Sequence, residues 1–261
     1  MSPSLHRRVR IALSPRRALA AAFSAGLRPR LLDQRAVACA RDVAGESTWE
    51  PALEALRAAI ELLPRARANA RVILSNHFVR YLLLPWKPEI VTAEEEVAFA
   101  TARFNQVYGT SAHDAVIRVS NAPAGSQRVA SAIERPLLHR LGELLAEFNL
   151  RAESIQPHLM SAVNAWGRRR LRDGWVALAE PGLLLLGLRR YGAWLSLRSR
   201  PLEPQAPLAA IIEQERRLLG LDAAPANVFL HEADGAVLDA TRVSAMLHDA
   251  RLRALALGGI A

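Results

Sequence analysis

The sequence has a single cysteine, Cys39, and this scarcity excludes two kinds of architecture. One cysteine forms no disulfide within the chain, and a zinc site built on cysteines needs more than one. We therefore expect the protein to work in the reducing cytoplasm.

Lysine is equally scarce, because Lys87 is the only one and arginine carries nearly all of the basic charge. A formal net charge of +9 is typical of proteins that bind nucleic acid or an anionic membrane. The arginines are scattered along the chain, however, and this favours an arginine-rich composition, without any partner, as the source of the charge.

Long apolar runs are missing too. A membrane-spanning helix needs roughly 18 to 20 apolar residues, and the longest candidate, Val176 to Leu188, is interrupted by Glu180-Pro181-Gly182. The basic N-terminal residues Arg7, Arg8 and Arg10 are not followed by the apolar stretch of a secretory signal. The pattern predicts a soluble chain that reaches a membrane only indirectly, by docking on a membrane complex.

No catalytic signature is present either. His231-Glu232-Ala233-Asp234 contains metal-ligand types but lacks a fourth ligand at a suitable spacing. Ser75-Asn76-His77 holds a nucleophile and a base without a G-x-S-x-G elbow, and His113-Asp114 and His248-Asp249 are isolated pairs. We interpret all of them as turn, cap or surface residues, and we expect no enzyme activity and no metal.

The stretch from Ala70 to Trp166 gives the clearest structural pattern. Ala70 to Trp86 reads as two apolar strands joined by a tight hairpin turn at Ser75-Asn76-His77. Thr92 and Glu95 form a capping box that starts a helix. Two strands, a helix that begins near Pro136, a short strand and another helix then complete an α/β unit.

The two ends of the chain share one order of elements, namely three strands, a helix and a strand. The order runs from Val9 to Ser75 and again from Trp175 to His231, and Thr241 is expected to cap a last helix through Arg253. Antiparallel strands at the start of each unit argue against a plain doubly wound sheet. We therefore predict a duplicated α/β fold of the ribonuclease-H or actin type, with mixed sheets.

At this level the chain resembles the cytoplasmic actin-like domain of type II secretion L proteins (GspL), type IV pilus M proteins (PilM) and the related MshI-like proteins. The stretches that carry the resemblance are Val72 to Trp86, Glu94 to Tyr108, Val116 to Asn121, Arg128 to Glu134, Leu137 to Leu150, Ser154 to Asn164 and Trp175 to Pro201. The match lies in element order and apolar pattern and covers most of the chain.

The resemblance implies three parts. Residues 1–75 with 151–170 would form a first actin-like lobe, 76–150 an inserted small α/β subdomain, and 171–261 a second, shortened lobe. It also implies a cytoplasmic scaffold, peripheral at the inner membrane of a bacterium. Such a scaffold holds the short cytoplasmic segment of a single-span membrane partner and couples it to an assembly ATPase.

The nucleotide-binding residues of that family are largely missing. Its nucleotide-binding members have an Asp and glycines in the first hairpin, where this chain has Ala12-Leu13-Ser14-Pro15-Arg16. The second hairpin keeps only Glu180 and Gly182 as a remnant, and Pro181 removes an amide donor. We therefore expect no cofactor and no ATP hydrolysis. The alternatives are an ATP-binding, sugar-kinase-like ATPase with divergent motifs, or a basic nucleic-acid-binding protein.

Two groups of residues are candidates for partner binding. Phe78, Tyr81 and Trp86 follow one strand, and an extended peptide can add to that strand if it lies at a sheet edge. The alternative is that these aromatic side chains fill the core. The densest basic run consists of Arg168, Arg169, Arg170 and Arg172. It suits an acidic partner surface, lipid headgroups, non-specific binding of nucleic acid or simply a solvated loop.

Overall fold

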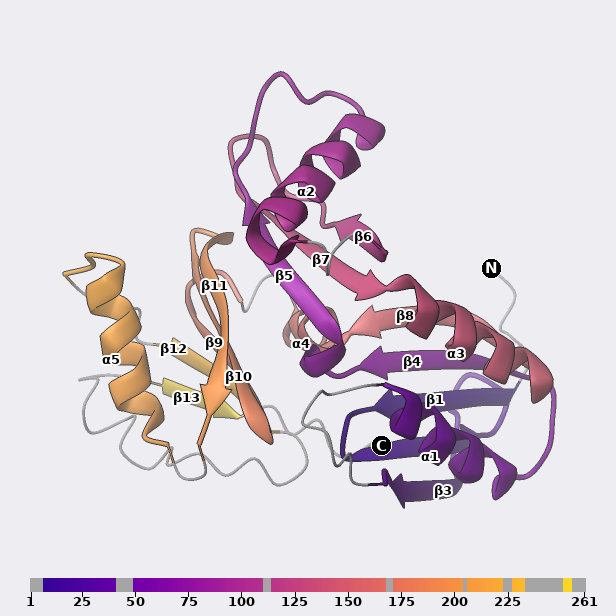
Figure 1. Cartoon of the computed structure of the whole chain (residues 1–261). Helices are drawn as coiled ribbons and strands as arrows, with labels where there is room; N and C mark the ends of the chain where they lie inside the picture. Colours follow the sequence, from indigo (N-terminus) through magenta and orange to yellow (C-terminus); the bar gives the residue numbers. More distant parts are fainter. Residues whose placement is uncertain are drawn as a thin grey trace.

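The computed structural model describes residues 7–40, 49–109, 114–167, 171–203, 206–222, 227–232 and 251–254 of the chain. They form two lobes and a small subdomain that projects from the first lobe (Figure 1). None of the helices within these ranges has the length and apolar character needed to cross a bilayer.

The first lobe is built on a five-stranded sheet with the order β3-β2-β1-β4-β8. Its strands are β1 (Arg7–Leu13), β2 (Arg17–Phe23), β3 (Leu31–Ala38), β4 (Ala68–Leu74) and β8 (Leu150–Pro157). The first three are antiparallel neighbours, whereas β4 runs parallel to β1 and β8 parallel to β4. Helix α1 (Glu50–Glu61) brings the chain from β3 to β4 and packs on this sheet.

The second lobe repeats this arrangement with the order β11-β10-β9-β12-β13. Its elements are β9 (Gly174–Glu180), β10 (Gly182–Arg190), β11 (Ala193–Leu202), α5 (Leu208–Leu218), β12 (Asn227–Glu232) and β13 (Arg251–Ala254). Three antiparallel strands, a helix and a parallel strand thus recur in both lobes, which confirms the predicted duplication. The predicted last helix is wrong at its end, because 251–254 pair with β12 as a parallel strand. Thr241, its expected cap, lies outside the described residues.

The inserted subdomain has a three-stranded sheet with the order β5-β7-β6. Its elements are the 3-10 turn η1 (Asn76–Phe78), β5 (Val79–Leu84), α2 (Ala93–Tyr108), β6 (Ala115–Val119) and β7 (Arg128–Glu134). The predicted capping box is confirmed: Thr92 Oγ1 accepts the Glu95 N–H at 3.1 Å, and Glu95 accepts the Thr92 N–H at 3.0 Å.

The predicted hairpin at Ser75-Asn76-His77 is wrong. β4 pairs with β1 and β8 in the first sheet, whereas β5 pairs with β7 in the small sheet. η1 therefore carries the chain from one sheet to another. Asn76 does not have the left-handed backbone that a tight hairpin requires.

The expected boundary of the inserted subdomain at residue 150 also needs correction. Helix α3 (Arg135–Glu147) packs on α1 and β8, so it belongs to the first lobe. Its apolar stripe of Leu137, Leu141, Leu144 and Leu145 is buried in the same core as β1 and β4. The inserted subdomain accordingly ends with β7.

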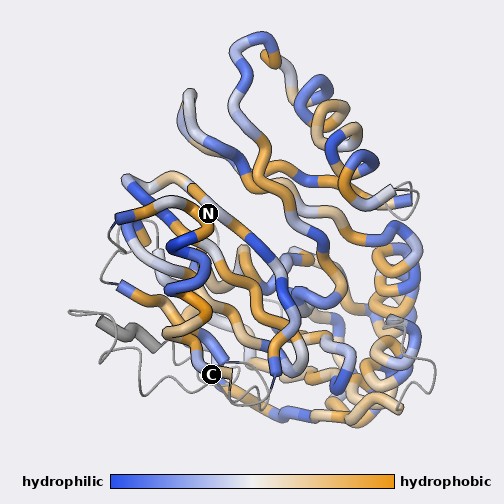
Figure 2. The backbone as a smooth tube through the Cα atoms, turned by 60° about the vertical axis from the view of Figure 1, so that its left-hand side comes forward, coloured by the Kyte–Doolittle hydropathy of each residue, from blue (hydrophilic) through white to orange (hydrophobic). Residues whose placement is uncertain are grey.

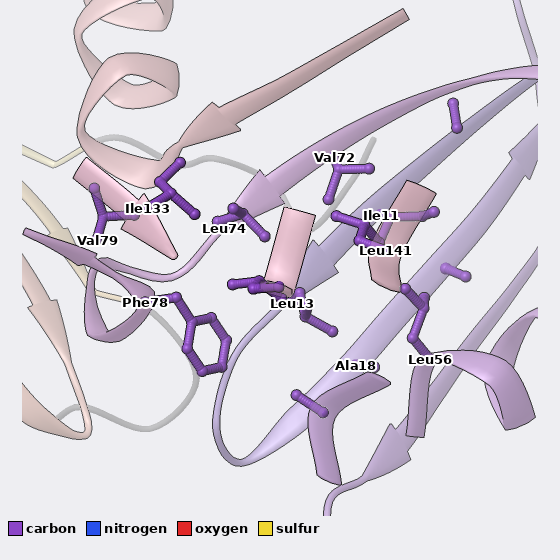
Figure 3. Packing of buried hydrophobic residues seen from close by; sticks show 14 of the residues in the cluster. Ile11, Leu13, Ala18, Leu56, Val72, Leu74, Phe78, Val79, Ile133 and Leu141 are labelled. Carbon is purple, nitrogen blue, oxygen red and sulfur yellow. The ribbon is translucent and has the colours of Figure 1, made fainter. Parts of the chain in front are cut away.

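One continuous core joins the first lobe to both of its neighbours. Ile11 and Val72 on the first sheet pack with Leu56 of α1 and Leu141 of α3 (Figure 3). Val79 and Ile133, on the small sheet, lie in the same cluster. Full burial of one such side chain contributes about 1.5–3 kcal/mol to the free energy of unfolding.

Helix α4 (His158–Trp166) joins the first lobe to the second sheet. Along β9, Val176 and Leu178 face the shared core, whereas Trp175 and Ala177 face the side covered by α5. The Trp166 ring of α4 meets Phe229 of β12 edge-on, with centroids 5.7 Å apart. Along the helices, each of which buries one side, hydrophobic and hydrophilic residues alternate (Figure 2).

Candidate functional site

The first hairpin, between β1 and β2, uses its own polar groups to close the turn. The Ser14 N–H donates to the Arg17 carbonyl at 3.1 Å, and Ser14 Oγ donates to the same carbonyl at 2.9 Å. Ser14 Oγ also accepts the Arg17 N–H at 3.2 Å. Pro15 has no N–H to offer. Few donors are therefore left for a phosphate, and no acid is present that would hold a metal ion.

The second hairpin, between β9 and β10, has a carboxylate at the corresponding place. Glu180 is the last residue of β9, and its side chain is buried, with 3% of the residue exposed. Pro181 and Gly182 follow, and Gly182 has the left-handed backbone that the turn needs (φ +83°). The strand thus ends by directing an acidic side chain into the molecule.

The Glu180 carboxylate joins the second lobe to the first. Its Oε1 accepts a hydrogen bond from the Asn76 N–H at 2.9 Å and contacts His158 Nδ1 at 2.8 Å. Its Oε2 accepts a hydrogen bond from the Ser75 hydroxyl. Ser75 and Asn76 stand at the end of β4, and His158 opens α4 just after β8. Adjacent parallel strands therefore bring these groups together at one edge of the first sheet.

Further contacts fix the residues around this carboxylate. The Tyr81 hydroxyl donates to Asn76 Oδ1 at 2.7 Å, and the Leu159 N–H donates to the same oxygen at 3.3 Å. His77 Nε2 lies 3.1 Å from the Pro181 carbonyl oxygen. We call Ser75, Asn76, Tyr81, His158 and Glu180 the inter-lobe cluster. It connects the second lobe, the first lobe and the inserted subdomain.

The electrostatics of the cluster favour an ionised Glu180. Burial alone raises the pKa of a carboxyl group, but the contact with His158 and the hydrogen bonds from Ser75 and Asn76 outweigh it and hold the Glu180 pKa below its usual value. Burial, together with the negative charge of Glu180, raises the pKa of Tyr81 well above its usual value. The Tyr81 hydroxyl therefore stays protonated and remains a donor.

The hairpin residues do not fit a magnesium nucleotide. Ser75 links the two turns, because its N–H donates to the Leu13 carbonyl at 2.9 Å while its hydroxyl binds Glu180. A phosphate placed between the turns would face the negative charge of Glu180 and few unused amide donors. The Glu180 oxygens already have several partners within the protein. Glu180 thus holds the lobes together in the place where a remnant of a nucleotide site was expected, and Gly182 only shapes the turn that follows it.

The residues expected to bind a partner are dispersed. Phe78 and Tyr81 are buried, with 7% and 5% exposed, whereas Trp86 is 39% exposed beyond the end of β5. β5 does lie at an edge of its sheet, but β11 of the second lobe runs beside it. Arg172 is exposed, and Arg168, Arg169 and Arg170 lie outside the described residues.

The candidate catalytic and metal-ligating residues do not assemble into such sites. Ser75 Oγ donates to Glu180 and accepts the His77 N–H at 3.1 Å, while the His77 ring faces Pro181. The His231 ring packs edge-on against His158, with centroids 4.8 Å apart. Within the described ranges, no group of at least three His, Cys, Asp or Glu residues is arranged to hold a metal ion. His113, Asp234 and the pair His248-Asp249 lie outside those ranges.

Sequence reasoning missed the role of His158 and the destination of Ser75 and Asn76. Each of these polar residues directly follows or closes a strand, at Leu74 and at Pro157. Polar residues at the ends of adjacent parallel strands converge at one edge of a sheet, so the position after each strand was the available signal.

No family model matches the sequence, and no curated protein does. Solved structures do match in fold. A chain of the PilM–PilN type IV pilus biogenesis complex is 14% identical, with a TM-score of 0.65, over 97% of this chain and 89% of that one. The cytoplasmic domain of EpsL, an inner-membrane component of the type II secretion system of Vibrio cholerae, is 11% identical. Its TM-score is 0.58, over 96% of this chain and 90% of that one.

A Bacteroides thetaiotaomicron protein of unknown function with an actin-like ATPase fold matches at 11% identity and a TM-score of 0.60, over 97% of this chain and 91% of that one. At sequence identities this low, the similarity shows a shared fold and nothing further. The pilus and secretion proteins that the sequence resembles are thus among its structural neighbours, and the chain has an actin-like fold.

Proposed function

We propose that this chain is a non-catalytic scaffold at the cytoplasmic face of a bacterial inner membrane, within a type IV pilus or type II secretion-like assembly platform. The observation that carries the proposal is the inter-lobe cluster. Glu180 stands where two lobes of this fold would meet a nucleotide, and Ser75, Asn76 and His158 bind it instead. A chain whose two lobes are joined at this place would serve as an adaptor between other proteins rather than turn over nucleotide.

The partner we propose is the short cytoplasmic segment of a single-span membrane protein, and the scaffold in turn would contact the assembly ATPase. Two structural neighbours support this proposal, one a PilM–PilN complex and the other the cytoplasmic domain of an inner-membrane secretion component. Neither nucleic acid nor bound ATP is part of the proposal.

The inserted subdomain offers a place for such a segment. Among the described strands, β6 pairs only with β7, so its other edge is open to an added strand, whereas β11 runs beside β5. Addition of an extended peptide to a sheet edge supplies affinity through main-chain hydrogen bonds. We therefore assign the peptide to the free edge of β6.

The hydrogen-bond pattern shows which amides of β6 are available. The Ser120 N–H donates to the Val129 carbonyl at 2.8 Å, and the Arg135 N–H donates to the Asp114 carbonyl at 2.9 Å. Every second residue of β6 therefore bonds to β7. The amides of Ala115, Ile117 and Val119 point the other way, toward the free edge.

The test uses the full chain and synthetic peptides that represent the cytoplasmic segments of single-span inner-membrane proteins from the same bacterium. Fluorescence anisotropy should find one that binds saturably. Val119→Pro removes an outward amide and leaves the bonds to β7 in place, so we expect roughly a fivefold or greater loss of affinity.

Val119→Ala is the matched control, because it shortens the same side chain and keeps the amide. It should bind the peptide like the original chain. The edge assignment is wrong if the proline and alanine variants bind equally well. The scaffold proposal itself fails if no such peptide binds.

A further inference from the structure

The end of the first lobe that lies away from the inter-lobe cluster is strongly basic. β1, β4 and β8 all begin there, and β2 ends there, as the pairing of Arg8 with Phe23 and of Ala68 with Leu150 shows. The strand ends lie on the right in Figure 1. Arginines surround these strand ends, and we call them the basic rim: Arg7, Arg8, Arg28, Arg30, Arg65, Arg67 and Arg151.

These arginines share one surface even though they come from distant parts of the sequence. Arg7, Arg8 and Arg65 line a shallow hollow with the apolar side chains of Ile60 and Phe148. The turn that carries Arg28 and Arg30 joins β2 to β3 beside the same strand ends. Arg151 lies next to Asn69, one residue into β4.

Few acidic groups balance this charge. No arginine of the basic rim forms an ion pair within the described part of the chain. The acidic residues Asp33, Glu147 and Glu153 are instead paired with Arg35, Arg57 and Arg71. Of the arginines in the rim, only Arg8 is partly buried, and the others are exposed. The basic rim is therefore a surface of positive electrostatic potential that faces the solvent.

Large apolar side chains are exposed at the same end. Leu27 is 85% exposed in the turn between β2 and β3, and Leu62, just after α1, is 58% exposed. Leu31 and Leu32, which start the edge strand β3, are each 49% exposed. Four exposed leucines among unpaired arginines are the composition of a surface that lies in a membrane interface.

We propose that the basic rim docks directly on an anionic phospholipid bilayer. The arginines would contact the headgroup phosphates, and Leu27 and Leu62 would enter the boundary between headgroups and acyl chains. This goes beyond the proposed scaffold, which needs only a protein partner. A nucleic acid favours aromatic side chains for base stacking, and Phe148, the aromatic residue that lines the hollow of the rim, is only partly exposed.

Docking in this way fixes the orientation of the molecule. Because β1, β4 and β8 run from the basic rim to the inter-lobe cluster, the second lobe lies at the end of the first sheet that faces away from the bilayer (Figure 1). The second lobe is then directed into the cytoplasm, toward an assembly ATPase.

The experiment is co-sedimentation of the full chain with unilamellar vesicles. Phosphatidylcholine vesicles are compared with vesicles that also contain phosphatidylglycerol. We expect binding only to the anionic vesicles and a decline as salt is added. The triple variant Arg28→Gln, Arg30→Gln and Arg65→Gln should lower partitioning by roughly tenfold or more.

The matched control changes Arg16, Arg103 and Arg140 to Gln, which removes the same net charge elsewhere, and it should retain most of the binding. A second variant, Leu27→Ser with Leu62→Ser, leaves the charge unchanged and should also weaken binding. Both leucines are exposed, so folding should be unaffected, and thermal unfolding verifies this.

The proposal is overturned if the rim and control variants lose binding equally, if neutral vesicles bind as well, or if the chain binds duplex DNA but not vesicles. No protein partner is present in the vesicle assay. Its failure is therefore distinct from a failure of peptide binding at β6.

Discussion

Glu180 Oε1 lies 2.8 Å from His158 Nδ1, although the two residues belong to different lobes. Asn76 Nδ2 lies farther from the same nitrogen, at 3.5 Å. A nitrogen that donates to the carboxylate cannot also accept from Asn76, and the shorter, charge-assisted contact decides that Nδ1 carries the proton. The contact ties the end of β9 to the start of α4 and so sets how the lobes meet.

Replacing Glu180 tests this connection directly. Glu180→Gln keeps the shape of the side chain but removes the charge that His158, Ser75 and the Asn76 amide all contact. We expect the free energy of unfolding at neutral pH to fall by about 1–3 kcal/mol, measured by urea denaturation. Glu54→Gln, on the exposed side of α1, is the control and should have almost no effect.

The same variant should change the dependence of stability on pH. The pKa of Glu180 in the folded protein lies below its usual value of 4.5, so the unfolded chain takes up this proton first as the pH falls. The stabilisation is complete above that value and is lost as the pH decreases through the folded pKa. Glu180→Gln should lack this part of the acid-induced decline. An identical pH profile for both proteins would contradict the role assigned to Glu180.

Addition of Mg-ATP should leave the thermal stability of the protein unchanged. A ligand present at a hundred times its Kd would raise the free energy of unfolding by about 2.7 kcal/mol, and thermal unfolding detects a change of that size easily. Because the hairpins offer few amide donors and Glu180 repels phosphate, we expect no shift in Tm with Mg-ATP. A rise in Tm that grows with nucleotide concentration would instead favour the ATPase alternative.

Much of the fold was predictable because its signals are local. Pro136 predicted where α3 begins, and the helix is present, with Leu137, Leu141 and Leu144 on its buried face. The repeated order of three strands, a helix and a strand gave the duplicated architecture. These features depend on residues close together in sequence, where capping, turn chemistry and periodicity operate.

What failed depends on contacts between distant residues. Two apolar strands around Ser75 have the same sequence pattern whether they pair with each other or enter different sheets. They enter different sheets because β4 pairs with β8 and β5 pairs with β7, and both of these partners come much later in the chain. Glu180 was placed correctly at the second hairpin, but what it binds was not predicted. Its partners Ser75 and Asn76 lie 105 and 104 residues away in the sequence. At 251–254, a strand replaced the expected helix because β12 supplies a parallel neighbour.

The fit between β10 and β11 can be tested with a pair of glycine substitutions. A Cβ on Gly187 would lie 2.6 Å from Trp194 Cζ3 and 3.0 Å from Leu197 Cδ1. Trp194 is almost buried and its ring packs under Arg189, so it cannot easily yield. Gly187→Ala should therefore destabilise the protein by about 1–3 kcal/mol through overpacking.

In Gly142→Ala, on the exposed side of α3, the new methyl group meets nothing within 4 Å. That change should stabilise the helix by about 0.5–1 kcal/mol. Urea denaturation of both variants measures the two effects, and the packing described for Trp194 is wrong if Gly187→Ala is as stable as the original chain.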